Sequence, residues 1–70
     1  MAPVLTPVDS SAIAAIGYDG TLYVEFRDSG HTYAYPGVSA ATYSALRQAR
    51  SIGAYFNQTI KDQYAEWRVD

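Results

Sequence analysis

The chain has 70 residues, a mass of 7.7 kDa, no cysteine and a formal net charge of −2 at pH 7. A chain of this length buries about 60% of its unfolded surface, which is enough for one small hydrophobic core. Because 49% of the residues are hydrophobic and 17% are charged, the composition favours a folded domain over disorder. The lack of cysteine excludes disulfides and thiolate metal sites, and the acidic balance argues against nucleic-acid binding by bulk positive charge.

The first residues carry no recognisable targeting signal. Residues 1–8 lack the basic start and the apolar run of a signal peptide. No apolar stretch approaches the ~20 residues that span a bilayer. We therefore expect a cytoplasmic protein without a membrane role. Pro3 and Pro7 predict an extended arm over residues 1–9, because proline removes a backbone donor and biases its predecessor toward extended geometry. Residues 10–70 are expected to form a single domain.

Strands are predicted from residue 12 to residue 35. In the first, residues 12–18, Ile13 and Ile16 lie three apart, which indicates either two partly covered faces or a β-bulge. Asp19-Gly20 is typical of a type I′ hairpin turn. The second strand, residues 21–27, alternates apolar and polar side chains. Its apolar face has Leu22, Val24 and Phe26, and its other face has Tyr23, Glu25 and Arg27.

The third strand, residues 31–35, follows a turn at residues 28–30, and its register is open. A three-residue loop would set Phe26 opposite Thr32 and turn Tyr33 and Tyr35 toward the polar face. A loop of even length would set Phe26 opposite Tyr33 and would place both tyrosines on the core side. A shift of one residue reverses every side chain, so the two registers predict opposite faces.

Two short helices are predicted after Pro36-Gly37. The first begins at an N-cap, Ser39, and runs to about Arg50, and the second runs from about residue 54 to residue 66. Apolar residues of the second helix fall near one stripe that continues to Trp67. The predicted fold is therefore α+β, a three-stranded antiparallel meander followed by two short helices packed on one of its faces. Its core residues are expected to be Ile16, Leu22, Val24, Phe26, Leu46, Phe56 and Ile60.

Catalytic chemistry has little support in the sequence. His31 is the only histidine. No serine lies in the strand-turn-helix elbow that activates a serine nucleophile. One histidine with scattered carboxylates gives no metal-ligand spacing. We expect no enzyme activity, no metal and no cofactor.

Seven tyrosines in 70 residues are the most unusual feature of the composition. One interpretation is that tyrosine fills a small core while its hydroxyl stays in water. The other is a stacking platform for bases, with arginines that hold phosphates. Residues 1–37 contain one base and four acids, whereas residues 38–70 contain four bases and three acids, so the charge distribution favours core packing.

Candidate ligand contacts follow from these interpretations. Asn57 is unusual within a helix, and we weigh a structural hydrogen bond against a ligand contact. Arg47 and Arg50 share a helix face at a spacing of three. The full candidate set is Tyr23, Arg27, Tyr33, Tyr35, Arg47, Arg50 and Asn57.

Several segments together resemble the KTSC domain family. They are residues 10–19, Leu22-Tyr23-Val24-Glu25-Phe26-Arg27, Tyr33-Ala34-Tyr35, and Ser51-Ile52-Gly53-Ala54-Tyr55-Phe56-Asn57 with Ile60. The family is named for a C-terminal domain of some lysyl-tRNA synthetases and also occurs as small stand-alone proteins in bacteria and phages. The resemblance covers about residues 8–65. In the family, the loop before Tyr-x-Tyr is often one residue shorter, which favours the even-loop register here.

The resemblance implies a small non-catalytic binding module. The family's function is unknown, and the synthetase context suggests RNA as the ligand. The alternative is a protein–protein interaction module, or an accessory protein that self-associates through the sheet face that the helices leave uncovered. Tyr23 and Arg27 fall on that face in either register, so they are the foremost predicted contacts.

Overall fold

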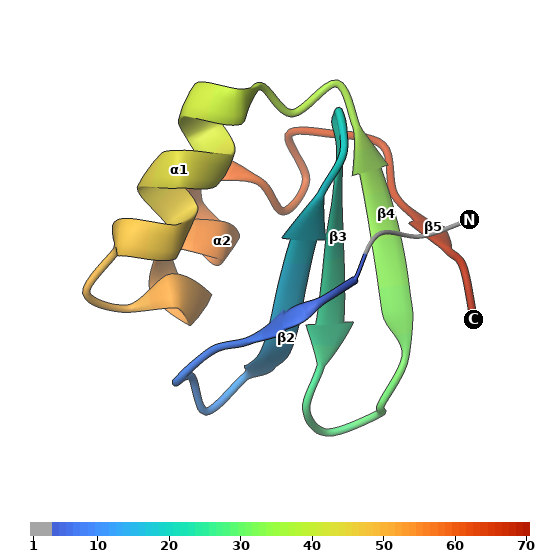
Figure 1. The fold of residues 1–70 in the computed structure, drawn as a ribbon, viewed down its shortest axis with the longest axis vertical. Helices are drawn as coiled ribbons and strands as arrows, with labels where there is room; N and C mark the ends of the chain where they lie inside the picture. Colours follow the sequence, from blue (N-terminus) through green and yellow to red (C-terminus); the bar gives the residue numbers. More distant parts are fainter. Residues whose placement is uncertain (1–3) are drawn as a thin grey trace.

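Two short helices cover one face of an antiparallel sheet in the computed structural model, which describes residues 4–70 (Figure 1). The strands are β1 (Thr6–Pro7), β2 (Ile13–Tyr18), β3 (Thr21–Phe26), β4 (Thr32–Pro36) and β5 (Trp67–Arg68), and the helices are α1 (Ala40–Gln48) and α2 (Ile52–Thr59). Within these residues the sheet order is β1-β2-β3-β4-β5, and every neighbouring pair is antiparallel. The α+β class is confirmed, but three strands was too few.

The two additional strands are short and lie at the edges of the sheet. β1 falls within the predicted arm, where Thr6 pairs with Ile16 and Pro7 with Ala15. Proline is tolerated there because an edge strand has no second neighbour that needs its missing N–H. Residues 1–3 of the predicted arm lie outside the described residues.

β5 lies where the second helix was expected to end. α2 stops at Thr59, the backbone N–H of Lys61 donates to the Phe56 carbonyl (2.9 Å), and Asp62 adopts a φ of 66°. A left-handed residue cannot continue a right-handed helix, so the chain leaves the helix axis. It then returns to the sheet, where Trp67 pairs with Ala34. Trp67, which was placed near the apolar stripe of the second helix, lies in β5 instead and is 56% exposed.

The register of β2 against β3 contains the anticipated irregularity. Pairing shifts between Ile13 and Ala15, so that Ile13 and Ile16 both reach the core although they are three apart. The hairpin turn is at the predicted place but is not type I′. Tyr18 lies opposite Leu22, so three residues, 19–21, separate these partners, and Gly20 alone among them has a positive φ (103°). A type I′ turn has two central residues, both with positive φ.

The β3–β4 pairing decides between the two predicted registers. Tyr33 and Tyr35 both lie on the core side of the sheet. Val24 lies opposite Tyr33, and Leu22 lies opposite Tyr35. The backbone N–H of Phe26 donates to the carbonyl of His31 (3.0 Å), the residue before β4, so four residues, 27–30, lie between these two partners. The loop is even, as expected from the family resemblance, but the partner of each β3 residue is two positions from the predicted one.

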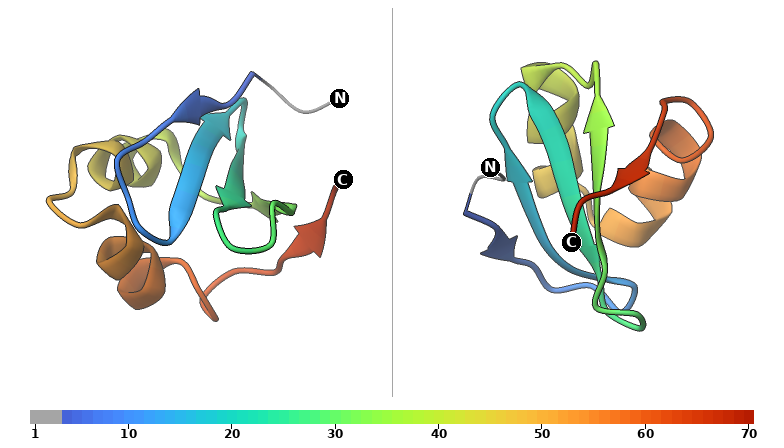
Figure 2. Two further views of the ribbon diagram at one scale, coloured as in Figure 1. Left: turned by 90° about the horizontal axis from the view of Figure 1, so that it is seen from below. Right: turned by 90° about the vertical axis from the view of Figure 1, so that its right-hand side faces the viewer.

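Both helices begin at serine caps. The Ser39 hydroxyl accepts from the N–H of Thr42 (3.1 Å), as predicted, and Ser51 accepts from Ala54 (3.2 Å). α2 therefore begins at Ile52, inside the predicted break. Viewed along the strands, both helices lie on the same side of the sheet (Figure 2). Across residues 4–70, no helix is long and apolar enough to cross a membrane.

The core lies between the helices and the face of the sheet that they cover. Its fully buried members include six of the seven predicted residues. Phe26 is the exception, because it is half-buried and packs against the edge of the core. The buried cluster consists of Ile13, Ile16, Leu22, Val24, Tyr35, Val38, Leu46, Ile52, Phe56 and Ile60.

Candidate binding site

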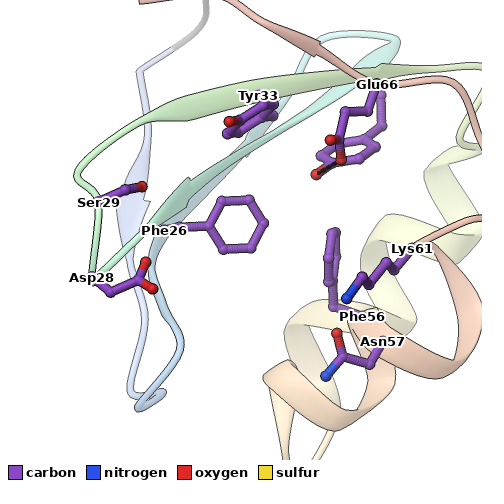
Figure 3. A pocket seen from close by; sticks show the side chains of 9 residues that line it. Phe26, Asp28, Ser29, Tyr33, Phe56, Asn57, Lys61 and Glu66 are labelled. Carbon is purple, nitrogen blue, oxygen red and sulfur yellow. Dashed lines mark hydrogen bonds between the residues drawn. The ribbon is translucent and has the colours of Figure 1, made fainter.

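A hollow of about 370 Å³ opens beside the core where β3 and β4 meet α2 (Figure 3). We call it the aromatic hollow. Its lining residues come from β3, β4, the loop between them, α2, and the segment between α2 and β5. Its lining residues are Phe26, Asp28, Ser29, Tyr33, Tyr35, Phe56, Asn57, Lys61 and Glu66.

The inner wall of the aromatic hollow consists of rings that pack edge to face. Phe26 lies 5.7 Å from Tyr33 between ring centroids, at an interplanar angle of 70°, and 5.5 Å from Phe56 at 71°. Tyr35 lies 5.4 Å from Phe56 at 77°. Such pairs each contribute about 0.5–1.5 kcal/mol beyond the area that they bury. The rings therefore hold one another in a defined arrangement before any ligand arrives.

The rim of the aromatic hollow is polar and exposed. Asp28 and Ser29 lie on one side, on the β3–β4 loop, whereas Asn57 and Lys61 lie on the other (Figure 3). Glu66 closes a third side, just before β5. With two carboxylates and one ammonium group, the lining has a formal charge of −1.

One hydrogen bond joins the core to this rim. The Tyr35 hydroxyl donates to a carboxylate oxygen of Glu66 (2.8 Å). Burial, and then the hydrogen bond and charge of Glu66, raise the pKa of Tyr35 above its ordinary value. The phenol therefore keeps its proton, and the bond fixes the segment before β5 against β4.

A second hollow, of about 410 Å³, adjoins the first and shares Asn57 with it. We call it the serine hollow; it is lined by Asp9, Ser10, Ser11, Ala12, Arg50, Ser51, Ile52, Gly53, Ala54 and Asn57. Two of its hydroxyls already serve the backbone. Ser10 accepts from the N–H groups of Ala12 and Ile13 (3.2 Å each), and Ser51 caps α2. The hydroxyls of Ser10 and Ser51 therefore stabilise the local backbone, and we take the aromatic hollow as the candidate binding site.

Three of the predicted contact residues come together at the aromatic hollow. Tyr33 and Tyr35 line it from β4, and Asn57 lines it from α2. Tyr35 is only 1% exposed, so it offers its hydroxyl and ring edge but no free ring face. Asn57 is exposed, and its side chain makes no hydrogen bond among residues 4–70. The structural hydrogen bond weighed for Asn57 is therefore not formed there.

The predicted arginines lie apart from the aromatic hollow. Arg27 donates through Nε to the Ser10 carbonyl (2.9 Å) and through Nη2 to the carbonyls of Val8 and Ile13 (3.3 Å each). It therefore fastens the segment that precedes β2. The Arg47 guanidinium lies 5.7 Å from the Tyr43 ring centroid on α1, and Arg50 borders the serine hollow.

Tyr23 lies on the sheet face that the helices leave uncovered. It pairs with Ala34, which in turn pairs with Trp67, and directly paired antiparallel residues share a face. Two aromatic side chains therefore flank a small alanine on this face. The nearby His31 ring is 3.3 Å from the Asp70 carboxylate, at the edge of the sheet.

The sequence contains partial signals for this site. Phe56 was predicted as a core residue, and Asn57 was noted as a residue that is unusual within a helix. The two were not predicted to share a site. The charged rim residues Asp28, Lys61 and Glu66 were not predicted as contacts. Asp28 was placed in a turn, and Lys61 and Glu66 were placed within the second helix. Trp67 was missed because its strand has only two residues.

Comparison with known proteins agrees with the resemblance. The family model described as the KTSC domain matches residues 9–64. A protein of Stutzerimonas stutzeri described as uncharacterized is 42% identical over 67 residues, which cover 90% of this chain and 93% of that protein. The crystal structure of a KTSC domain protein from Yersinia pestis superposes with a TM-score of 0.90 at 34% identity, covering 96% of this chain and 97% of that one. This chain belongs to the KTSC domain family.

Proposed function

We propose that this KTSC domain is a non-catalytic binding module whose aromatic hollow receives a segment of a protein partner. One observation carries the proposal. Residues of two separate motif segments, Tyr33-Ala34-Tyr35 and the Phe56-Asn57 pair, line a single hollow together with Phe26. Preformed aromatic walls with a few polar groups at the rim are typical of sites that bind side chains or small ligands.

The chemistry of the rim supports binding rather than catalysis. The Ser29 hydroxyl accepts from the backbone N–H of His31 (3.2 Å), a role in the turn. The His31 ring pairs with Asp70 and does not line either hollow. An activated nucleophile donates a hydrogen bond to a nearby base, and among residues 4–70 the Ser29 hydroxyl only accepts one.

A peptide-display selection on the purified domain tests this proposal. We expect selected peptides to bind saturably and to shift the backbone resonances of Asn57 and of the β3–β4 loop. Asn57→Ala should weaken this binding, whereas Gln58→Ala should leave it unchanged. The two residues are exposed neighbours on α2, so the pair of variants isolates the face that the ligand touches. Peptides that leave the hollow's resonances unmoved would contradict the proposal.

RNA binding is the second candidate, and one observation favours it. Tyr23 and Trp67 flank Ala34 on the uncovered sheet face, where bases could stack on both rings. Labelled single-stranded RNA titrated at about 50 mM and 200 mM salt checks this candidate, since phosphate contacts weaken steeply with salt. Binding through this face requires that Tyr23→Ala and Trp67→Ala reduce the affinity. Saturable binding that neither variant affects, or no binding at the lower salt, would exclude that surface.

A further inference from the structure

We infer that the aromatic hollow takes an organic cation, the guanidinium or ammonium group of a basic side chain on the partner. The inference rests on the proposed function and adds the chemical class of the ligand.

The aromatic lining is the first observation. Phe26, Tyr33 and Phe56 line the hollow with rings whose mutual contacts fix their orientation. A cation near an aromatic ring is attracted to the negative face of its π-system, and the attraction grows when water is excluded. Methylene groups of a lysine or arginine stem also pack well on such rings.

The unpaired carboxylates are the second observation. Asp28 and Glu66 both line the hollow, and neither lies within 4.0 Å of a basic nitrogen among residues 4–70. Glu66 accepts a hydrogen bond from the Tyr35 hydroxyl (2.8 Å), which holds its carboxylate beside the rings. The two carboxylates make this rim negative, and one of them is held in place by Tyr35, so the rim favours a positive ligand.

Lys61 distinguishes a positive ligand from a negative one. It is the one cationic residue that lines the hollow, and it forms no salt bridge within the described part of the chain. A positive ligand is repelled by this ammonium group, so removing it should tighten binding. An anionic ligand, such as an acidic peptide or a phosphate, would use Lys61 as its anchor, so the same change would weaken binding.

The primary experiment is a nuclear magnetic resonance titration with small probes. N-acetyl-arginine amide and N-acetyl-lysine amide provide the two cations, and N-acetyl-citrulline amide is the neutral match for arginine. We expect the cations to shift the resonances of residues 28–29 and Asn57, which border the hollow. Citrulline should leave them in place. The relative affinity of the two cations shows which head group fits better.

Charge variants provide the decisive comparison. Asp28→Asn and Glu66→Gln should each weaken binding of the arginine probe about two- to fivefold, the range for an exposed ion pair. Lys61→Gln should strengthen it by a similar factor. Glu25→Gln is the matched control, because it makes the same charge change on a strand residue that alternates with buried Val24 and so faces away from the helices. Its effect should stay below about twofold.

The outcomes separate this inference from the proposed function. If selected peptides shift the hollow's resonances but lose affinity on Lys61→Gln, the hollow binds peptides and the cationic ligand is wrong. If citrulline binds as well as arginine, the cationic ligand is also wrong. If selected peptides do not touch the hollow, the proposed function fails, whatever the arginine probe does.

Discussion

Removal of the Tyr35 hydroxyl tests the link between the core and the segment before β5. Tyr35→Phe keeps the ring and its packing on Phe56, and it deletes only the hydrogen bond to Glu66 (2.8 Å). Hydrogen bonds to charged groups contribute about 1.5–3 kcal/mol, but Glu66 is exposed and water competes for it. We therefore expect a loss of about 1 kcal/mol in the free energy of unfolding at pH 7. For a domain of this size, that loss lowers the melting temperature by about 4–8 °C.

The same variant should change the response to alkali. Burial and the hydrogen bond to Glu66 raise the pKa of Tyr35 in the folded protein, whereas an unfolded tyrosine titrates near pH 10. The stability that this proton contributes is present below pH 10 and is lost as the pH rises above it. Tyr35→Phe should therefore lose stability less steeply above pH 10 than the natural chain does.

Tyr33→Phe is the control for both measurements. Its hydroxyl makes no hydrogen bond among residues 4–70, and its half-buried ring stays in contact with Phe26. Urea unfolding followed by circular dichroism at pH 7 and between pH 9 and pH 11 provides the comparison. Equal stabilities and equal alkaline slopes for the two variants would refute the role assigned to the Tyr35–Glu66 bond.

Three further predictions, which use four substitutions, can be checked by the same unfolding measurements. Phe56→Ala should cost about 3–5 kcal/mol, because it empties a buried site and removes two ring contacts; a loss below about 1 kcal/mol would mean that the core tolerates the gap. Arg27→Ala should cost about 1 kcal/mol through three carbonyl contacts, whereas Arg47→Ala should stay within about 0.5 kcal/mol; equal effects would disprove the structural role of Arg27. Gly53→Ala should stabilise by about 0.5 kcal/mol, because its new Cβ would sit at ordinary contact distance, 3.5 Å from Ala12; a marked destabilisation would show that the serine hollow is closed to a methyl group.

The central strands were predictable because their side chains alternate. Leu22 and Val24 identify the buried face of β3 without any tertiary information. The spacing of Ile13 and Ile16 left two alternatives, two partly covered faces or a bulge, and the register shift between Ile13 and Ala15 supports the bulge. The β3–β4 register was open because it depends on how many loop residues separate the strands, a number that side-chain patterns do not determine.

The edge strands could not be predicted for a different reason. A two-residue strand has no periodicity, and the apolar stripe of the second helix continues without a break through Ile60, Tyr64 and Trp67. The helix ends instead at Thr59, and the left-handed conformation of Asp62 then turns the chain away from the helix axis. A left-handed conformation is unfavourable for a residue other than glycine. The pairing of Trp67 with Ala34 on β4 offsets this cost. Tertiary pairing thus overrides helical periodicity here.

The aromatic hollow exists because the sheet extends farther than the helices can cover. Phe26 ends β3 beyond the main cluster, so its ring remains half-buried although its position in the alternation is a core position. The segment after α2 then crosses back to β5 and brings Glu66 onto Tyr35. Without that return, the carboxylate would have no fixed place beside the rings. The turn of the chain after α2, which the sequence analysis did not predict, therefore also places Glu66 at the rim of the candidate site.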